Sequence, residues 1–231
     1  MNRLKLPKTD QWSSLSRNDW GEILELSRAK TFQRKFQIVE AFTKLVAEKG
    51  YHQTKHGDIA KACKVTRQLV DHHFPTDRAL LVLTYRYIYA RFQKHASDAL
   101  VSRQGALNQF KAYVTSIPAW VQIHPADATF LIHYFGIAPV YPELSAFLER
   151  NIKIGQERIH TLLIGLRDKK QIAAVSDEVL LEQASSVQFQ IFGFVVLNSG
   201  PRPMTAAAAQ KKGDELWRSC AAVVGAAQTA R

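Results

Sequence analysis

The sequence predicts an all-α fold, with three short helices near the N-terminus followed by a larger helical domain. Apolar residues recur every three or four positions in one segment after another, the spacing of a helix that buries one face. No segment shows the strict apolar and polar alternation of a half-buried strand. Of the 231 residues, 46% are hydrophobic, which suffices for a full-sized core.

Residues 1–30 are interpreted as an N-terminal extension. Ser16, followed three residues later by Asp19, is suited to cap a short helix that ends near Arg28. The tryptophans of this segment are expected to pack against the body of the protein.

Residues 31–78 are predicted to form a three-helix domain. The first helix runs from Thr31 to a stop at Gly50. Its buried stripe consists of Phe32, Phe36, Val39, Phe42 and Val46. Thr54 is suited to cap a second helix, and Thr66 a third one that ends before Pro75. The tight turn between the second and third helices is typical of a helix-turn-helix.

Residues 79–231 are predicted to form the second domain. A long helix begins at Thr76 and links the two domains. Further helices are expected at 105–123, 126–137, 142–170, 177–198 and 205–228, separated by glycines and prolines. The last two are expected to form an antiparallel pair.

The charge of the chain is concentrated in the three-helix domain. The net charge is +11, and residues 28–78 carry eleven Lys or Arg against five Asp or Glu. An excess of this kind indicates an anionic partner, either nucleic acid or a lipid surface, although a solvated basic face would look the same.

Composition also indicates the compartment. The longest apolar stretches, such as Ile191–Leu197, fall far short of the roughly 20 residues that a membrane span requires. The N-terminus lacks the pattern of a signal peptide. Two cysteines, Cys63 and Cys220, are too few for a disulfide framework. A cytoplasmic protein with reduced cysteines and no membrane partner is expected.

The three-helix domain resembles the DNA-binding segment of the TetR family of transcription regulators. The order and spacing match without a gap over about 50 residues, carried by Ile38-Val39-Glu40-Ala41, Leu45, Gly50-Tyr51, Thr54, Asp58-Ile59-Ala60, Val65-Thr66, His73-Phe74 and Ala79-Leu80. The resemblance implies a helix-turn-helix domain followed by a helical domain that binds a ligand and dimerises.

Under this resemblance, the third helix of the domain enters the major groove of double-stranded DNA. Arg67 and Gln68 in its first turn are the candidates for reading bases, since arginine pairs with guanine and glutamine with adenine. His72 is expected to face outward beside them. Candidates for phosphate contacts are Thr54, Lys55, Thr66, His73 and Lys35.

Three residues depart from the family pattern. Lys64 replaces the usual turn glycine, at a strain of about 1 kcal/mol if the backbone there is left-handed. Asp71 stands where tyrosine is usual, and would repel phosphate unless it accepts from a cytosine or pairs with Arg67. Asp77 stands where lysine is common, which puts a phosphate contact there in doubt.

The resemblance also implies a small-molecule cavity in the helical domain. Aromatic residues with polar tips gather in its central helices, and the candidates for ligand binding are Tyr113, Trp120, His124, Phe130, His133 and Tyr134. The spacing of the histidines does not favour a metal site, and no motif of a catalytic site is present, so no cofactor and no enzymatic activity are expected.

The sequence therefore predicts a homodimeric repressor that a hydrophobic or aromatic ligand releases from a near-palindromic operator. Two alternatives remain open at this point. Asp71 and Asp77 suit a helical hydrophobe-binding protein whose DNA-binding motif has degenerated. An all-α enzyme would depend on His124 or His133.

Overall fold

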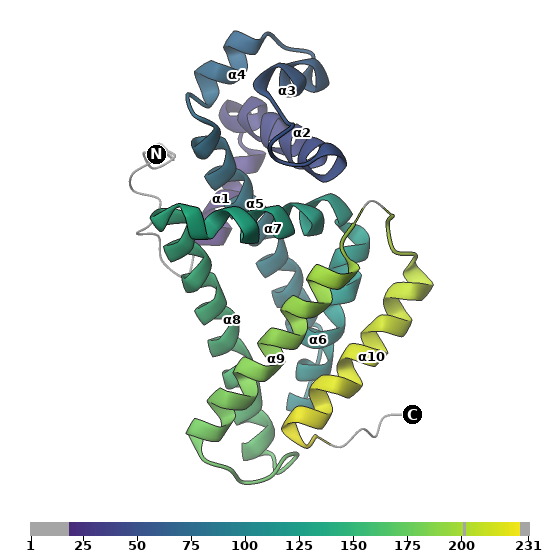
Figure 1. Cartoon of the computed structure of the whole chain (residues 1–231). Helices are drawn as coiled ribbons and strands as arrows, with labels where there is room; N and C mark the ends of the chain where they lie inside the picture. The colour runs from purple at the N-terminus through teal and green to yellow at the C-terminus, as the bar shows by residue number, and fades with distance from the viewer. Residues whose placement is uncertain (1–18, 201, 227–231) are drawn as a thin grey trace. The chain divides into compact units, whose positions relative to one another are not determined.

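The computed structural model describes residues 19–200 and 202–226, and within these ranges the chain is helical with no β-strand (Figure 1). The α-helices are α1 Asp19–Arg28, α2 Gln33–Lys49, α3 His56–Cys63, α4 Arg67–His73, α5 Asp77–Val101, α6 Ala106–Ile123, α7 Pro125–Ile137, α8 Pro142–Asp168, α9 Asp177–Asn198 and α10 Ala206–Val224. Short 3₁₀ turns cover Lys30–Phe32 and Ala138–Val140. The all-α prediction is confirmed.

Most helix boundaries follow the local signals in the sequence. Gly50 ends α2 with a φ of 86°, a conformation that favours glycine. Thr76 accepts a hydrogen bond from the Ala79 N–H at 3.1 Å and so caps α5. Ser176 and Thr205 cap α9 and α10 in the same way. The predicted cap at Ser16 lies outside the described residues, and α1 ends at Arg28 as expected.

The chain divides into two compact units. The first unit comprises the described residues up to Lys94 together with Ala126–Phe147, and the second comprises His95–Pro125 together with the described residues from Leu148 onward. Helix α5 and helix α8 each contribute residues to both units. The first unit therefore contains the predicted helix-turn-helix together with most of α5 and α7.

The core of the first unit is apolar and tightly packed. Ile38, Val39, Ile59 and Val70 are fully buried where α2, α3 and α4 meet. Aromatic rings extend this core to α7, whose Phe130 lies edge-on to Phe42 of α2 with ring centroids 5.8 Å apart.

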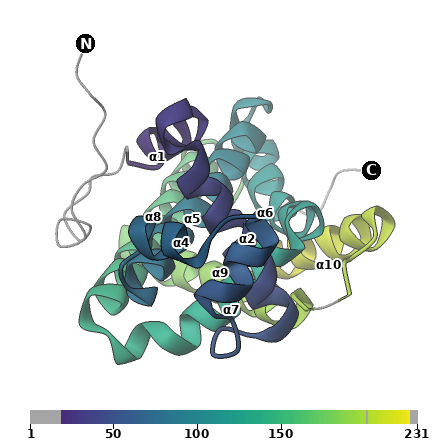
Figure 2. The same ribbon diagram turned by 90° about the horizontal axis from the view of Figure 1, so that it is seen from above.

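In the second unit, α6 packs against both α9 and α10. Helices α6 and α10 lie side by side in both views (Figures 1 and 2). Gly213 of α10 faces Thr115 of α6, where a Cβ would make an ordinary van der Waals contact at 3.7 Å. Phe110 meets Trp217 edge-on at 5.6 Å. The predicted antiparallel pair of α9 and α10 is present (Figure 1).

The two cysteines are free. Cys220 is buried in α10, and its thiol donates to Oε1 of Gln190 at 3.2 Å. Burial raises the pKa of this thiol to about 12, so it is a packing residue, as the sequence predicts.

Helix α9 is apolar on more than its buried side. By length and composition alone it is the one helix of the described residues that could cross a membrane, because its most apolar 18 residues have a mean hydropathy of 1.3. Only 33% of that stretch is buried inside the protein. Its exposed apolar residues include Leu181, Phe189, Val196 and Leu197. The sequence predicts this helix over the same residues, 177–198.

Candidate nucleic-acid interface

The turn between α3 and α4 contains a left-handed residue at Lys64, where the family pattern has glycine. Lys64 adopts a left-handed backbone, with φ 54° and ψ 48°. This conformation ends α3 with two hydrogen bonds. The Val65 N–H donates to the Ala60 carbonyl at 2.9 Å, and the Lys64 N–H donates to the Lys61 carbonyl at 3.2 Å. The turn therefore forms without glycine, at a strain of about 1 kcal/mol.

Helix α4 presents a polar face to solvent. Thr66 caps it, with its hydroxyl oxygen accepting from the Leu69 N–H at 3.3 Å. Val70 and the following Phe74 point into the core. Arg67, Gln68 and His72 are consequently exposed, as a recognition helix requires.

The carboxylates of Asp71 and Asp77 are both paired. Asp71 Oδ1 lies 2.6 Å from Nδ1 of His56, and its Oδ2 lies 3.5 Å from Nε of Arg67. Asp77 Oδ1 lies 3.1 Å from Nε2 of the same His56. The pair with Arg67 was one of the two roles that the sequence left open for Asp71. His56 itself was missed, because its partners are far away in the sequence and no spacing indicates them.

Basic side chains from the first turn of α2, Arg34 and Lys35, lie close to His73 in the last turn of α4. Nζ of Lys35 lies 5.2 Å from the centroid of the Phe74 ring, and partial burial lowers the pKa of this lysine. Burial lowers the pKa of His73 as well, and the positive charges of Lys35, His72 and Arg34 lower it further. Positive charges held this close repel one another, so a bound anion such as a DNA phosphate would stabilise them.

The predicted cap at Thr54 is wrong. Thr54 is buried, and its hydroxyl donates to the Gly50 carbonyl at 2.9 Å instead of capping α3. The N-cap position is occupied by Lys55, whose backbone N–H donates to Asp58 at 3.0 Å. Asp58 also pairs with Lys49 at 2.7 Å, and these two bonds lower its pKa. The side chain of Lys55 remains exposed.

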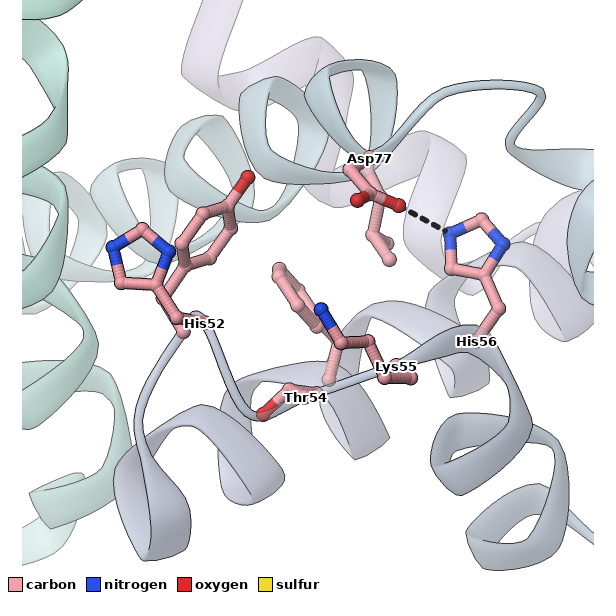
Figure 3. Close-up of a pocket in the computed structure, with 8 residues that line it drawn as sticks. His52, Thr54, Lys55, His56 and Asp77 are labelled. Carbon is pink, nitrogen blue, oxygen red and sulfur yellow. Dashed lines mark ion pairs between the residues drawn. The ribbon is translucent and has the colours of Figure 1, made fainter.

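A small pocket of about 80 Å³ opens beside the start of α3 (Figure 3). Its lining residues are Phe42, Tyr51, His52, Thr54, Lys55, His56, Asp77 and Leu80. The imidazole of His56 points toward Asp77 across it. Within the described residues, no group of three or more His, Cys, Asp or Glu is arranged to hold a metal ion.

The six residues predicted to bind a ligand are divided between the two units. Tyr113, Trp120 and His124 belong to the second unit, whereas Phe130, His133 and Tyr134 belong to the first. Most of their side chains are buried, and His124 and His133 are partly exposed.

Tyr134 illustrates how tightly these side chains are packed. Its ring stacks on Tyr85 with centroids 3.6 Å apart, and its hydroxyl donates to the Leu144 carbonyl at 3.1 Å. Burial strongly raises its pKa, so the phenol is neutral.

Comparison with known families identifies the segment that carries the helix-turn-helix. Residues 38–83 match the family model described as bacterial regulatory proteins, tetR family. The likeness to the TetR family covers this segment of the chain. The matched range begins inside α2 and ends inside α5, so it includes both helices of the motif and the turn at Lys64.

One curated relative is a helix-turn-helix regulator. YuxN of Bacillus subtilis (strain 168), an uncharacterized HTH-type transcriptional regulator, is 40% identical over 52 residues, which is 22% of this chain. The matched part spans only 18% of that protein's length.

Two solved structures extend the likeness to the whole fold. A putative transcriptional regulator from Saccharomonospora viridis in complex with choline has a TM-score of 0.70 at 15% identity, over 82% of this chain and 97% of its own. AibR in complex with isovaleryl coenzyme A and operator DNA has a TM-score of 0.65 at 17% identity, over 84% of this chain and 100% of its own. At this identity the likeness is one of fold.

Proposed function

We propose that this chain is a cytoplasmic, DNA-binding transcription regulator, a repressor that a small hydrophobic or aromatic ligand releases from its operator. The observation that carries the proposal is the tetR match at residues 38–83, on a motif whose recognition helix exposes Arg67 and Gln68. It acts by binding and not by catalysis.

The pairing of Asp71 supports DNA binding over a degenerate motif. An unpaired aspartate on a recognition helix would repel phosphate. Here its two oxygens face His56 and Arg67, at 2.6 Å and 3.5 Å. The negative charge of Asp71 is therefore balanced within the domain, and Arg34 and Lys35 lie close to His73 at the end of α4.

Selection from a randomised duplex library tests DNA binding and yields the operator in one experiment. We expect a near-palindromic site, and an affinity that falls steeply with salt, since each neutralised phosphate contributes a slope of about −0.9. Recovery of no sequence, together with retention of an apolar ligand, would establish the hydrophobe-binding alternative instead.

We propose a homodimer that forms through α9 and α10. Phe189 and Leu197 on α9 are 66% and 83% exposed, a large apolar area for a helix of a soluble protein. Gly193 lies between them, and a Cβ there would meet nothing within 4 Å, so another backbone has room to approach. A second copy of this face would bury it and would place two recognition helices on one duplex.

The effector is proposed to bind beside Tyr113 and Trp120 of α6, whose aromatic rings are buried in the second unit. Two proteins of the same fold hold small molecules, choline in one and isovaleryl coenzyme A in the other. Ligands found by screening with mass spectrometry should then be titrated calorimetrically with and without operator. We expect operator to weaken ligand binding about 5–150-fold, and equal affinities would refute the switch.

A further inference from the structure

The side chain of Gln188 crosses from α9 to α8 inside the second unit. It is 5% exposed, and its amide lies against the backbone of Gly155. A Cβ at Gly155 would lie 2.7 Å from Oε1 and 3.0 Å from Nε2 of this amide, so any residue other than glycine would displace it. From the loop that joins them, α8 and α9 diverge within this unit (Figure 1), and the long side chain of Gln188 occupies space between them.

The carbonyl oxygen of this amide is a buried acceptor to which no described residue donates a hydrogen bond. Other glutamines of the same unit are paired. Gln156 and Gln183 each donate to a neighbouring helix, Gln190 accepts from the thiol of Cys220, and none of the three is buried as deeply as Gln188. An amide oxygen buried without a donor destabilises the fold, and methionine would fill a similar volume without that cost. Oε1 of Gln188 is therefore suited to a donor that the chain itself does not supply.

The surroundings of Gln188 agree with the proposed place of the effector. Helix α6, which carries the buried Tyr113, packs against α9 in this unit. Ala184 and Ile191, one turn away on either side of Gln188, are buried and apolar. A mostly apolar wall with a single polar group set into it is typical of a small-molecule site.

We propose that Gln188 is the residue of the effector site that recognises the polar group of the ligand. Its Oε1 accepts a hydrogen bond from a hydroxyl or amide N–H of the ligand, and the apolar remainder of the ligand packs against the neighbouring side chains. The effector is then an uncharged, apolar molecule that carries a hydrogen-bond donor. This inference rests on the proposed ligand-responsive function.

The absence of charge on the ligand follows from the groups around the site. Gln188 is neutral, and burial raises the pKa of Tyr113, so its phenol is neutral as well. The positive charge of Arg158 acts on the Tyr113 hydroxyl, which disfavours an ammonium group beside it. A carboxylate has no proton to donate to Oε1, and burying a charge among neutral groups costs more than one hydrogen bond contributes.

Matched pairs of probe molecules test the donor. The probes are benzyl alcohol, cyclohexanol and 1-octanol, each beside its methyl ether, which keeps the oxygen but lacks the proton. The affinity of the full chain for each probe follows from the rise of its unfolding midpoint with probe concentration. We expect at least one alcohol to bind about ten-fold more tightly than its ether, the difference that one hydrogen bond makes. Equal affinity within every pair, or no binding of any alcohol, would overturn the proposal.

Two variants assign the preference to Gln188. Gln188→Met removes the acceptor at nearly the same volume, so the chain should be at least as stable as the wild type and should bind each alcohol as weakly as its ether. Gly155→Ala displaces the amide without removing it, and should weaken the binding of alcohols more than that of ethers. The matched control is Gln190→Met, two residues further along α9, which should keep the wild-type preference. A preference that survives in Gln188→Met would overturn the proposal.

The probe measurements need no DNA, so they are independent of operator binding. If library selection yields an operator but the probes show no preference for alcohols, this inference fails and the DNA-binding function stands. If no operator is recovered, the DNA-binding function fails, and the alcohol preference still decides the role of Gln188.

Discussion

The two units of this protein expose surfaces of opposite character. The first unit gathers cationic side chains at its surface: Arg34 and Lys35 lie close to the end of α4, and the carboxylate of Asp71 is paired with His56 and Arg67. The second unit exposes apolar area instead, above all at Phe189 and Leu197 of α9. A surplus of cations suits a phosphate backbone, whereas exposed apolar area requires another apolar surface. This contrast agrees with the proposal that the first unit binds DNA and the second binds another copy of the chain.

The largest effect is expected from charging the exposed face of α9. Phe189→Asp combined with Leu197→Asp should make the chain monomeric and lower its operator affinity about 10²–10⁴-fold, because the two recognition helices would no longer bind as one unit. Sedimentation and DNA titration measure the two effects. The control is Val140→Asp, at a valine that is 71% exposed outside α9. A doubly substituted chain that remains dimeric would show that the exposed apolar face of α9 is not the dimer interface.

The next effect concerns a buried charge in the first unit. Asp127 is 5% exposed, and its Oδ2 lies 3.4 Å from Nη1 of Arg91. Burial raises its pKa to about 6, more than Arg91 lowers it. Because the folded-state pKa is the higher one, the associated stability is present below about pH 4 and is lost as pH rises through about 6.

Asp127→Asn should therefore gain stability relative to the wild type as pH rises. We expect a relative gain of about 2–3 kcal/mol in the free energy of unfolding between about pH 4 and pH 8. Denaturant unfolding at fixed protein concentration measures it. Asp214→Asn, at an exposed aspartate of α10, is the control and should show no such trend. Parallel pH profiles for Asp127→Asn and the wild type would contradict the argument.

Two substitutions in the first unit separate base reading from phosphate contact. Arg67→Ala should cost about 1–3 kcal/mol and relax the preference at one base position. Lys35→Ala should lower affinity evenly across sequences and reduce the salt slope by about one. Selection from a randomised library with each variant measures both effects. An even loss in Arg67→Ala would make Arg67 a phosphate contact.

The smallest effect concerns the strained turn. Lys64→Gly should stabilise the chain by about 1 kcal/mol, because the left-handed conformation costs glycine less than lysine. Lys170 has the same φ of 54° in the loop before α9, so Lys170→Gly provides the matched comparison in the second unit. Thermal unfolding measures both. Destabilisation by Lys64→Gly would show that the greater freedom of glycine in the unfolded chain outweighs the relief of strain.

Much of the fold was predictable from local signals. Gly50, Thr66 and Thr76 mark helix ends that depend on neighbouring residues only, and the predicted helices from residue 105 onward agree with the observed ones within four residues at each end. The wrong cap at Thr54 was predicted by the same reasoning as the correct caps at Thr66 and Thr76. A hydroxyl next to a helix start was expected to accept from that helix, but α3 has Lys55 as its N-cap, and the Thr54 hydroxyl donates to the Gly50 carbonyl behind it.

The sequence by itself determined the helices, the presence of a tight turn near Lys64 and the position of Arg67 and Gln68 at the start of the third helix of the motif. These features depend on backbone propensities and on contacts within a few residues. Only the tertiary structure decided the role of Asp71 and Asp77, because the His56 that joins them belongs to another helix, 15 residues before Asp71. It also decided which apolar side of α9 stays exposed, since several sides of that helix carry apolar residues and only the packing of α6 and α10 selects the buried one.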